Sequence, residues 1–261
     1  MQILSVYPQP TIAARLVDLL IGALPEKGAD VWLVSPWITD FSVSLETRGP
    51  LLPLLGRDLE HTQLSVLVGL VARWNTVHVV VRPPSELVGR GELSRLAALL
   101  RARRQLLPLA RQDETVREVL SIMERESEDL VTAAISNGDT VRLAARLRTV
   151  PGVKLHFNPR LHTKLLVTPR AALLGSANFT YSGMSRNDEI ALIVDSPADV
   201  AALRRAAEAT ASRPFSLDAN EYSFLGSLPE GERTACLELL DDAATPQSLA
   251  DLLRVACQFA A

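Results

Sequence analysis

A histidine, a lysine, a serine, an asparagine and a glutamate lie close together in residues 161–194, LHTKLLVTPRAALLGSANFTYSGMSRNDEIALIV. Imidazole is a nucleophile, ammonium, amide and hydroxyl groups bind anionic oxygens, and a carboxylate can orient an imidazole. Together these groups can attack a phosphodiester and stabilise the charge that develops on it. The apolar runs between them are typical of buried strands. The candidate site residues are His162, Lys164, Gly175, Ser176, Asn178 and Glu189.

The spacing of these residues is consistent with one site. His162 and Lys164 are two residues apart, so on a strand their side chains share a face, about 7 Å apart. Gly175 ends the run AALLG and permits a tight turn, after which Ser176 and Asn178 can face a crevice, because ligands bind at strand ends in α/β sheets. Residues 180–185 are expected to open a helix whose free amides attract an anion. No metal-ligand spacing is present, so no metal and no cofactor are predicted.

Three neighbouring residues admit a second interpretation. Asp188 could replace Glu189 as the carboxylate, but the two point to opposite faces once the strand has begun, and Glu189 is favoured. His156, in VKLHF, is interpreted as a structural histidine on a neighbouring strand. Trp37 could stack on a base or a lipid head group, although tryptophan at the end of an apolar strand more often belongs to the core.

The elements that must position the candidates alternate along the chain. Strands are expected at 31–34, 76–82, 153–157, 162–167, 171–175 and 189–194. Residues 11–24 and 199–212 have the period of amphipathic helices. Residues 85–149 predict two or three further helices with charged outer faces, and 214–261 is mostly helical. The order predicts an α/β protein whose apolar strands are covered on both faces.

Composition limits the possible partners. The chain is 48% apolar and 22% charged, with a net charge of −3. Proteins that coat nucleic acid without specificity usually carry a basic excess, so a polyanion must here be bound by a local patch. Cys236 and Cys257 are interpreted as small buried apolar side chains, which fits a protein of the reducing cytoplasm. No signal peptide and no membrane span is indicated, so a cytoplasmic protein is expected.

A basic run lies in the predicted helical block at Arg101, Arg103, Arg104 and Arg111. Such runs are usually solvated faces. If the block flanks the site, the same guanidinium groups could bind a nucleic-acid backbone, and both interpretations stay open.

The order HTK, GSANFT and NDE resembles the signature of the phospholipase D superfamily, which is His-x-Lys, then Asp, then Gly-Ser-x-Asn and a later acidic residue. The segment SPWITD at 35–40 is also similar to the one that follows the first strand in nuclease-like members. One position departs from the signature, because the family Asp falls at Pro169. Some nuclease and DNA-repair branches also lack that Asp.

The resemblance implies a fold and a mechanism. The fold is an α/β/α sandwich of phospholipase D type in residues 1–213, with a helical insertion at about 85–149 and a helical C-terminal extension at 214–261. The mechanism uses two histidines, one that attacks phosphorus and one that protonates the leaving oxygen. None of His61, His78 and His156 is followed by a matching lysine, so the chain holds one motif. A homodimer that brings two copies of His162 together is therefore expected.

In this resemblance His162 is the nucleophile, Lys164, Ser176 and Asn178 bind the phosphoryl oxygens, and Glu189 orients His162. Single-motif members are commonly nucleases, so the expected substrate is nucleic acid, DNA rather than RNA. The chain also resembles phospholipase D-like proteins of bacterial phage-defence or DNA-modification systems, which implies partner proteins. Two alternatives remain, a lipid phosphodiesterase and a catalytically silent subunit that binds nucleic acid.

Overall fold

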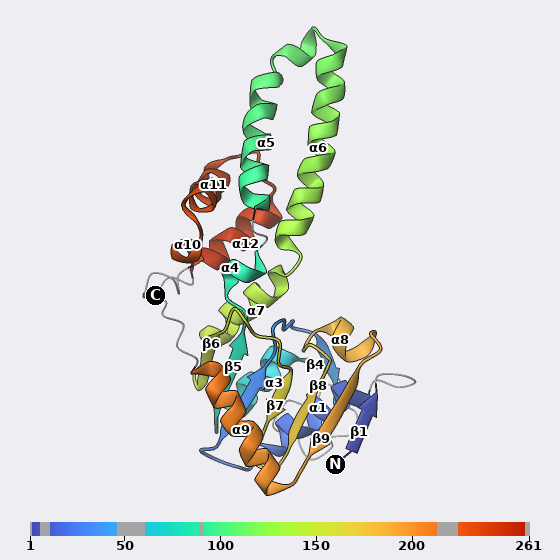
Figure 1. The fold of residues 1–261 in the computed structure, drawn as a ribbon, viewed down its shortest axis with the longest axis vertical. Coiled ribbons are helices and arrows are strands. Elements are labelled where there is room, and N and C mark those ends of the chain that lie inside the picture. The colour runs from blue at the N-terminus through green and yellow to red at the C-terminus, as the bar shows by residue number, and fades with distance from the viewer. Residues whose placement is uncertain (1, 6–10, 46–60, 89–90, 213–223, 259–261) are drawn as a thin grey trace. The chain divides into compact units, whose positions relative to one another are not determined.

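Figure 1 shows a computed structural model of the chain, which describes residues 2–5, 11–45, 61–88, 91–212 and 224–258. The chain divides into two compact units. Met1–Arg82 and Arg146–Pro214 form one, called here the sheet unit. Pro83–Ala145 and Phe215–Ala261 form the other, called the helical unit. The predicted insertion and C-terminal extension, distant in sequence, thus belong largely to one unit.

Seven strands form the main sheet, in the order β1-β9-β8-β7-β2-β5-β6. Their bounds are Gln2–Ser5 for β1, Asp30–Val34 for β2, Thr76–Val81 for β5, Val153–Phe157 for β6, Leu165–Val167 for β7, Ala172–Gly175 for β8 and Ile190–Val194 for β9. β2, β5 and β6 run parallel, whereas β7, β8, β9 and β1 are joined by antiparallel pairs. All six strands expected from the sequence are present. β1 was not expected.

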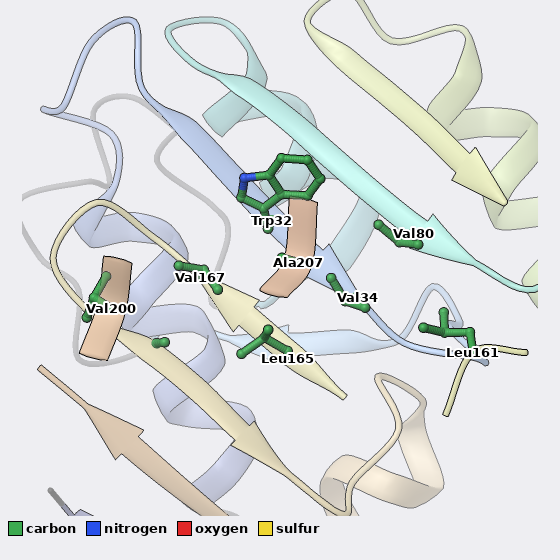
Figure 2. Packing of buried hydrophobic residues seen from close by; sticks show 9 residues of the cluster. Trp32, Val34, Val80, Leu161, Leu165, Val167, Val200 and Ala207 are labelled. Atoms are coloured by element: carbon green, nitrogen blue, oxygen red, sulfur yellow. The ribbon is translucent and has the colours of Figure 1, made fainter. Parts of the chain in front are cut away.

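Helices cover both faces of this sheet, which confirms the α/β class. α1 (Thr11–Gly22) and α3 (Leu64–Ala72) lie on one face, and α9 (Pro197–Ala211) lies on the other (Figure 1). Under α9, Trp32, Val34, Leu165 and Val167 point from β2 and β7 into one buried cluster with Ala207 (Figure 2). The apolar residues of adjacent strands alternate in and out of this layer, as the period of a strand requires.

A separate two-stranded sheet adjoins α3. β3 (Ser42–Ser44) pairs antiparallel with β4 (His61–Gln63). Asp40, just before β3, accepts hydrogen bonds from the amide of Ser65 at 2.9 Å and from its hydroxyl at 2.8 Å. Because these groups lie in the first turn of α3, a carboxylate distant in sequence satisfies the start of that helix. Arg146 forms an ion pair with the same carboxylate.

The helical unit is built around a hairpin of α5 (Glu92–Leu106) and α6 (Glu114–Ile135), linked by the short η2 (Leu109–Arg111) (Figure 1). Its other helices are α4 (Pro84–Leu87), α10 (Phe224–Ser227), α11 (Glu230–Asp241) and α12 (Gln247–Cys257), and α7 (Gly138–Arg148) begins in it. Cys236 is buried, Cys257 is partly buried, and both are free thiols. Within the described ranges, no helix has both the length and the apolarity to cross a membrane.

Most of the basic run on α5 is engaged in ion pairs inside this unit. Arg101 lies 3.7 Å from Glu238, and Arg103 lies 3.1 Å from Glu124. Arg104 lies 2.6 Å from Asp242. Carboxylates of the same unit therefore compete with any phosphate backbone for these three guanidinium groups.

Candidate active site

Five strands place their site residues at one edge of the sheet. β2 and β5 are parallel and end there, β7 is antiparallel to β2 and starts there, β8 ends there and β9 starts there. This side of the sheet is formed by the ends of strands and not by an edge strand, and it is called here the catalytic edge. It collects residues from both halves of the sequence. Its polar residues are Ser35, Arg82, His162, Lys164, Ser176, Asn178 and Glu189.

His162 and Lys164 lie immediately before β7 and not within a strand, which begins only at Leu165. The amide of Gly175 donates to the carbonyl of Lys164 at 3.2 Å, so the pairing with β8 extends one residue beyond β7. The ammonium of Lys164 donates to the carbonyl of His162 at 2.7 Å. His162 is exposed and Lys164 is partly buried, so this short segment presents the imidazole and the ammonium at the catalytic edge.

Arg82 binds the imidazole, and no sequence argument singled it out. It directly follows β5, and its Nη2 lies 2.9 Å from Nε2 of His162. Its Nε donates to the carbonyl of Leu161 at 3.1 Å. The sequence does contain a feature that could have indicated Arg82. It is an arginine at the end of a buried strand and before Pro83-Pro84, and ligands bind at strand ends in α/β sheets.

Ser176 and Glu189 form the second contact pair of the catalytic edge. The hydroxyl of Ser176 donates to the carboxylate of Glu189 and accepts the amide of Ile190 at 3.2 Å. The amide of Ser176 donates to the carbonyl of Ile190 at 3.0 Å. The predicted contact of Glu189 with His162 is not formed in this structure. β8 and β9 are neighbours, whereas His162 precedes β7, one strand further away.

Gly175 and Asn178 shape the turn after β8. A Cβ atom at Gly175 would collide with the carbonyl of Ile190 and lie 2.8 Å from Cα of Ala191, so the close approach of β9 requires glycine. Asn178 is partly buried, and its Oδ1 is enclosed without a hydrogen-bond partner among the described residues. An unpaired buried carbonyl costs free energy, and because Oδ1 only accepts hydrogen bonds, it is the amide nitrogen of Asn178 that could donate to an anionic oxygen.

The expected helix after this turn is present as α8 (Tyr181–Ser185). The side chain of Thr180 caps it by accepting the amide of Gly183 at 3.1 Å. α8 has one turn, so its macrodipole contributes little to an anion site.

The segment SPWITD holds the turn after β8 in place. The hydroxyl of Ser35 donates to the carbonyl of Trp37 at 2.7 Å and accepts the amide of Phe179 at 3.2 Å. The amide of Thr39 donates to the carbonyl of Phe179 at 2.9 Å. Trp37 is partly buried, and the guanidinium of Arg82 lies 5.1 Å from its ring centroid.

Pro169, which occupies the family Asp position, lies at the opposite edge of the sheet. β7 starts at the catalytic edge and ends at Val167, so the bend at 168–171 that joins it to β8 is far from His162. The amide and hydroxyl of Thr168 both donate to the carbonyl of Ala171, at 2.9 and 2.8 Å, and close this bend. A carboxylate at this position of the chain would not reach the catalytic edge.

His156 has the surroundings of a structural histidine. Its Nε2 lies 3.0 Å from Nδ1 of His78, whose Nε2 lies 3.0 Å from Asp30. Trp32 stacks on His78 with ring centroids 3.9 Å apart. Burial, followed by the charges of His78 and Lys154, lowers the pKa of His156 to about 4. The alternative carboxylate Asp188 is exposed.

The sheet, its helical layers and the polar residues at one edge define an α/β protein that gathers cationic and polar side chains at the ends of its strands. Residues 104–210 match the family model described as "Cardiolipin synthase, PLD-like domain". This match agrees with the resemblance to the phospholipase D superfamily carried by HTK and GSAN, and it supports the phosphodiesterase class predicted from them. Among the described residues, no group of three or more His, Cys, Asp or Glu side chains could hold a metal ion.

Two solved structures are similar to the chain. NucT from Helicobacter pylori is 11% identical with a TM-score of 0.41, and the match covers 80% of this chain and 93% of that one. Nuc from Salmonella typhimurium, a phospholipase D family member, is 12% identical with a TM-score of 0.39, covering 80% and 91%. These TM-scores are too low to bear on substrate or assembly. No curated protein sequence matches the chain.

Proposed function

We propose that the protein is a phosphodiesterase that cleaves nucleic acid without a metal ion, through a phosphohistidine at His162. The observation that carries the proposal is the convergence of His162, Lys164, Ser176 and Asn178 from β7 and β8 on one sheet edge. These groups supply a nucleophile and donors for anionic oxygens, which are the parts that phosphoryl transfer needs.

In the proposed reaction Nε2 of His162 attacks phosphorus with its lone pair. A nitrogen–phosphorus bond forms, and the bond between phosphorus and the leaving oxygen breaks. A general acid donates a proton to that oxygen. Water, deprotonated by the same group, then attacks phosphorus and releases His162. Lys164, Ser176 and Asn178 stabilise the charge on the non-bridging oxygens, for which Lys164 must turn from the carbonyl of His162 and the hydroxyl proton of Ser176 must turn from Glu189.

Glu189 acts in this proposal through Ser176. Its carboxylate accepts the Ser176 hydroxyl and fixes the side chain beside the turn that follows β8. The role predicted from the family, orientation of His162, requires a rearrangement that brings Glu189 to the imidazole. The two roles predict different activities for a variant that lacks both Ser176 and Glu189.

The general acid is proposed to be His162 of a second copy of the chain. The other histidines do not supply this acid. His78 and His156 are hydrogen-bonded to each other, and His61 lies in the separate sheet of β3 and β4. A two-fold axis would supply the missing imidazole from an identical site.

An apolar strip on the sheet supports this dimer. α9 packs on β7 and β2, and leaves apolar side chains of the adjoining strands on the same face uncovered. Ile3 and Ile190 are 69% and 63% exposed, and Leu174, Leu192 and Val194 are partly buried. These five residues form the β9 strip. It reaches the catalytic edge, because Ile190 follows Glu189, and a second copy seated there would lie beside the site.

Nucleic acid is the proposed substrate, DNA rather than RNA, with lipid hydrolysis and silent binding as the competing outcomes. The test incubates the protein in excess EDTA with labelled single-stranded DNA, duplex DNA and RNA, and with anionic phospholipid vesicles. His162→Ala is compared with His61→Ala, which removes an exposed histidine of the small sheet. Cleavage of nucleic acid that survives EDTA, is lost in His162→Ala and persists in His61→Ala supports the proposal.

Other results of this test contradict it. Binding of DNA without cleavage supports the silent subunit, and release of a phospholipid head group supports the lipid enzyme. Cleavage by the wild-type protein that EDTA abolishes would show that a metal ion takes part. Partner proteins of a phage-defence or DNA-modification system stay a prediction of the family resemblance.

A further inference from the structure

Arg82 is held at the catalytic edge by three contacts with two segments of the chain. Its Nε donates to the carbonyl of Leu161 at 3.1 Å, and its guanidinium carbon lies 5.1 Å from the ring centroid of Trp37. Its Nη2 lies 2.9 Å from Nε2 of His162. The bond to Leu161 fixes the inner end of the guanidinium, and the bond to His162 uses its outer end.

The contact with His162 determines the state of the imidazole. A guanidinium group only donates hydrogen bonds and stays protonated in proteins. Nε2 of His162 must therefore accept with its lone pair, and a neutral ring carries its proton on Nδ1. A lone pair that accepts a hydrogen bond is not available to attack phosphorus. In this structure the Nε2 lone pair of His162 is therefore occupied by Arg82.

We propose that Arg82 is a phosphate-responsive guard of His162. Without an anion, Nη2 occupies the Nε2 lone pair. When a phosphodiester arrives, the guanidinium exchanges the neutral imidazole for an anionic oxygen, because a hydrogen bond between two charged groups is the stronger one. The exchange frees Nε2 and adds Arg82 to the groups that bind the non-bridging oxygens. This inference rests on the proposed role of His162 as nucleophile.

The geometry suits such an exchange. Arg82 is partly buried and His162 is exposed, so the outer end of the guanidinium is open to an incoming anion. The bond to Leu161 and the ring of Trp37 contact the rest of the group, so Arg82 can release His162 while it keeps both of these contacts. A guanidinium group can bind two phosphate oxygens at once, whereas the imidazole offers it only one acceptor atom.

The test measures His162 itself and needs no turnover. Diethyl pyrocarbonate modifies a free imidazole lone pair, and peptide mass spectrometry reports the rate at each histidine. We expect Arg82→Ala to raise the rate at His162 several-fold, while the rate at exposed His61 stays unchanged. Binding of inorganic phosphate, measured by calorimetry, should weaken about tenfold, which corresponds to the loss of one charged contact. Arg82→Lys should retain part of the phosphate affinity.

A purely structural role gives a different pattern. In that case Arg82→Ala would raise the modification rates of His61 and His162 together and lower the melting temperature, and the proposal is overturned. An unchanged or slower rate at His162 in a folded variant also overturns it, as does undiminished phosphate affinity. Both measurements are independent of cleavage. If Arg82 behaves as expected but the protein cleaves nothing, the nuclease proposal is contradicted and the exchange at Arg82 is still supported.

Discussion

Glu189 is bonded to Ser176, which ends the neighbouring strand, and not to His162, which precedes the strand beyond. If Glu189 acts by positioning Ser176, the variants Ser176→Ala and Glu189→Ala each break the hydrogen bond that fixes the Ser176 side chain, whose hydroxyl must turn from Glu189 to donate to a phosphoryl oxygen. We expect each to lower kcat by about 10²-fold, the usual loss for one such donor. The double variant should be no worse than either single variant, because both changes break one hydrogen bond. Single-turnover cleavage rates measure this, and multiplicative losses would favour the contact of Glu189 with His162.

The proposed dimer predicts a defect at Ile190, whose side chain is 63% exposed on the β9 strip. Ile190→Arg should give a monomer and abolish cleavage, since a charge on the strip opposes its burial. The matched control is Val66→Arg, an exposed apolar residue of α3 that lies outside the strip. Light scattering and cleavage are measured on the same samples. A fully active monomer would contradict the shared site.

Gly175→Ala should destabilise the sheet unit. The added methyl group would collide with the carbonyl of Ile190, so β8 and β9 must separate. We expect a loss of about 1–3 kcal/mol in the free energy of unfolding, as for other overpacked sites. Gly22→Ala is the control, because a Cβ there meets nothing within 4 Å. Urea titrations followed by circular dichroism compare the two, and equal midpoints would argue against the close approach.

Asp40 is expected to stabilise α3 from outside the helix. Asp40→Ala removes the acceptor of the Ser65 amide and hydroxyl and the ion partner of Arg146. Loss of such a helix-start acceptor costs about 1 kcal/mol. Glu126→Ala, which breaks an exposed pair with Arg95, should change stability by less than about 0.5 kcal/mol. Thermal and urea unfolding of both variants test the difference.

His156 predicts a pH-dependent stability. Its folded pKa of about 4 lies below the ordinary histidine value of 6.5, so the unfolded chain binds more protons between these values. The contribution to stability is full above pH 6.5 and is lost as the pH falls through about 4. The neighbouring charged groups are His78, Lys154 and Asp30. His156→Gln should flatten the slope of unfolding free energy between pH 4.5 and 6.5, and an unchanged slope would remove His156 as its source.

The sequence by itself determined the α/β class, six of the seven strands of the sheet and the candidate site residues His162, Lys164, Ser176, Asn178 and Glu189, but not Arg82. These follow from local signals, namely apolar runs such as 76–82, a glycine required at 175 and the motif spacing of HTK and GSAN. Local periodicity reports which face of an element is buried, and it needs no knowledge of neighbours. The edge strand β1 was missed because four residues at the start of the chain carry too little periodic signal.

Only the tertiary structure decided which of these side chains contact one another. Arg82 and His162 are 80 residues apart and meet only because β5 ends, and β7 starts, at the same edge. Glu189 reaches Ser176 because β9 pairs with β8, and Pro169 lies far from His162 because β7 ends at the opposite end of the sheet. Strand order and direction set these contacts. They arise from long-range pairing across the sheet, which the local pattern of a sequence does not encode.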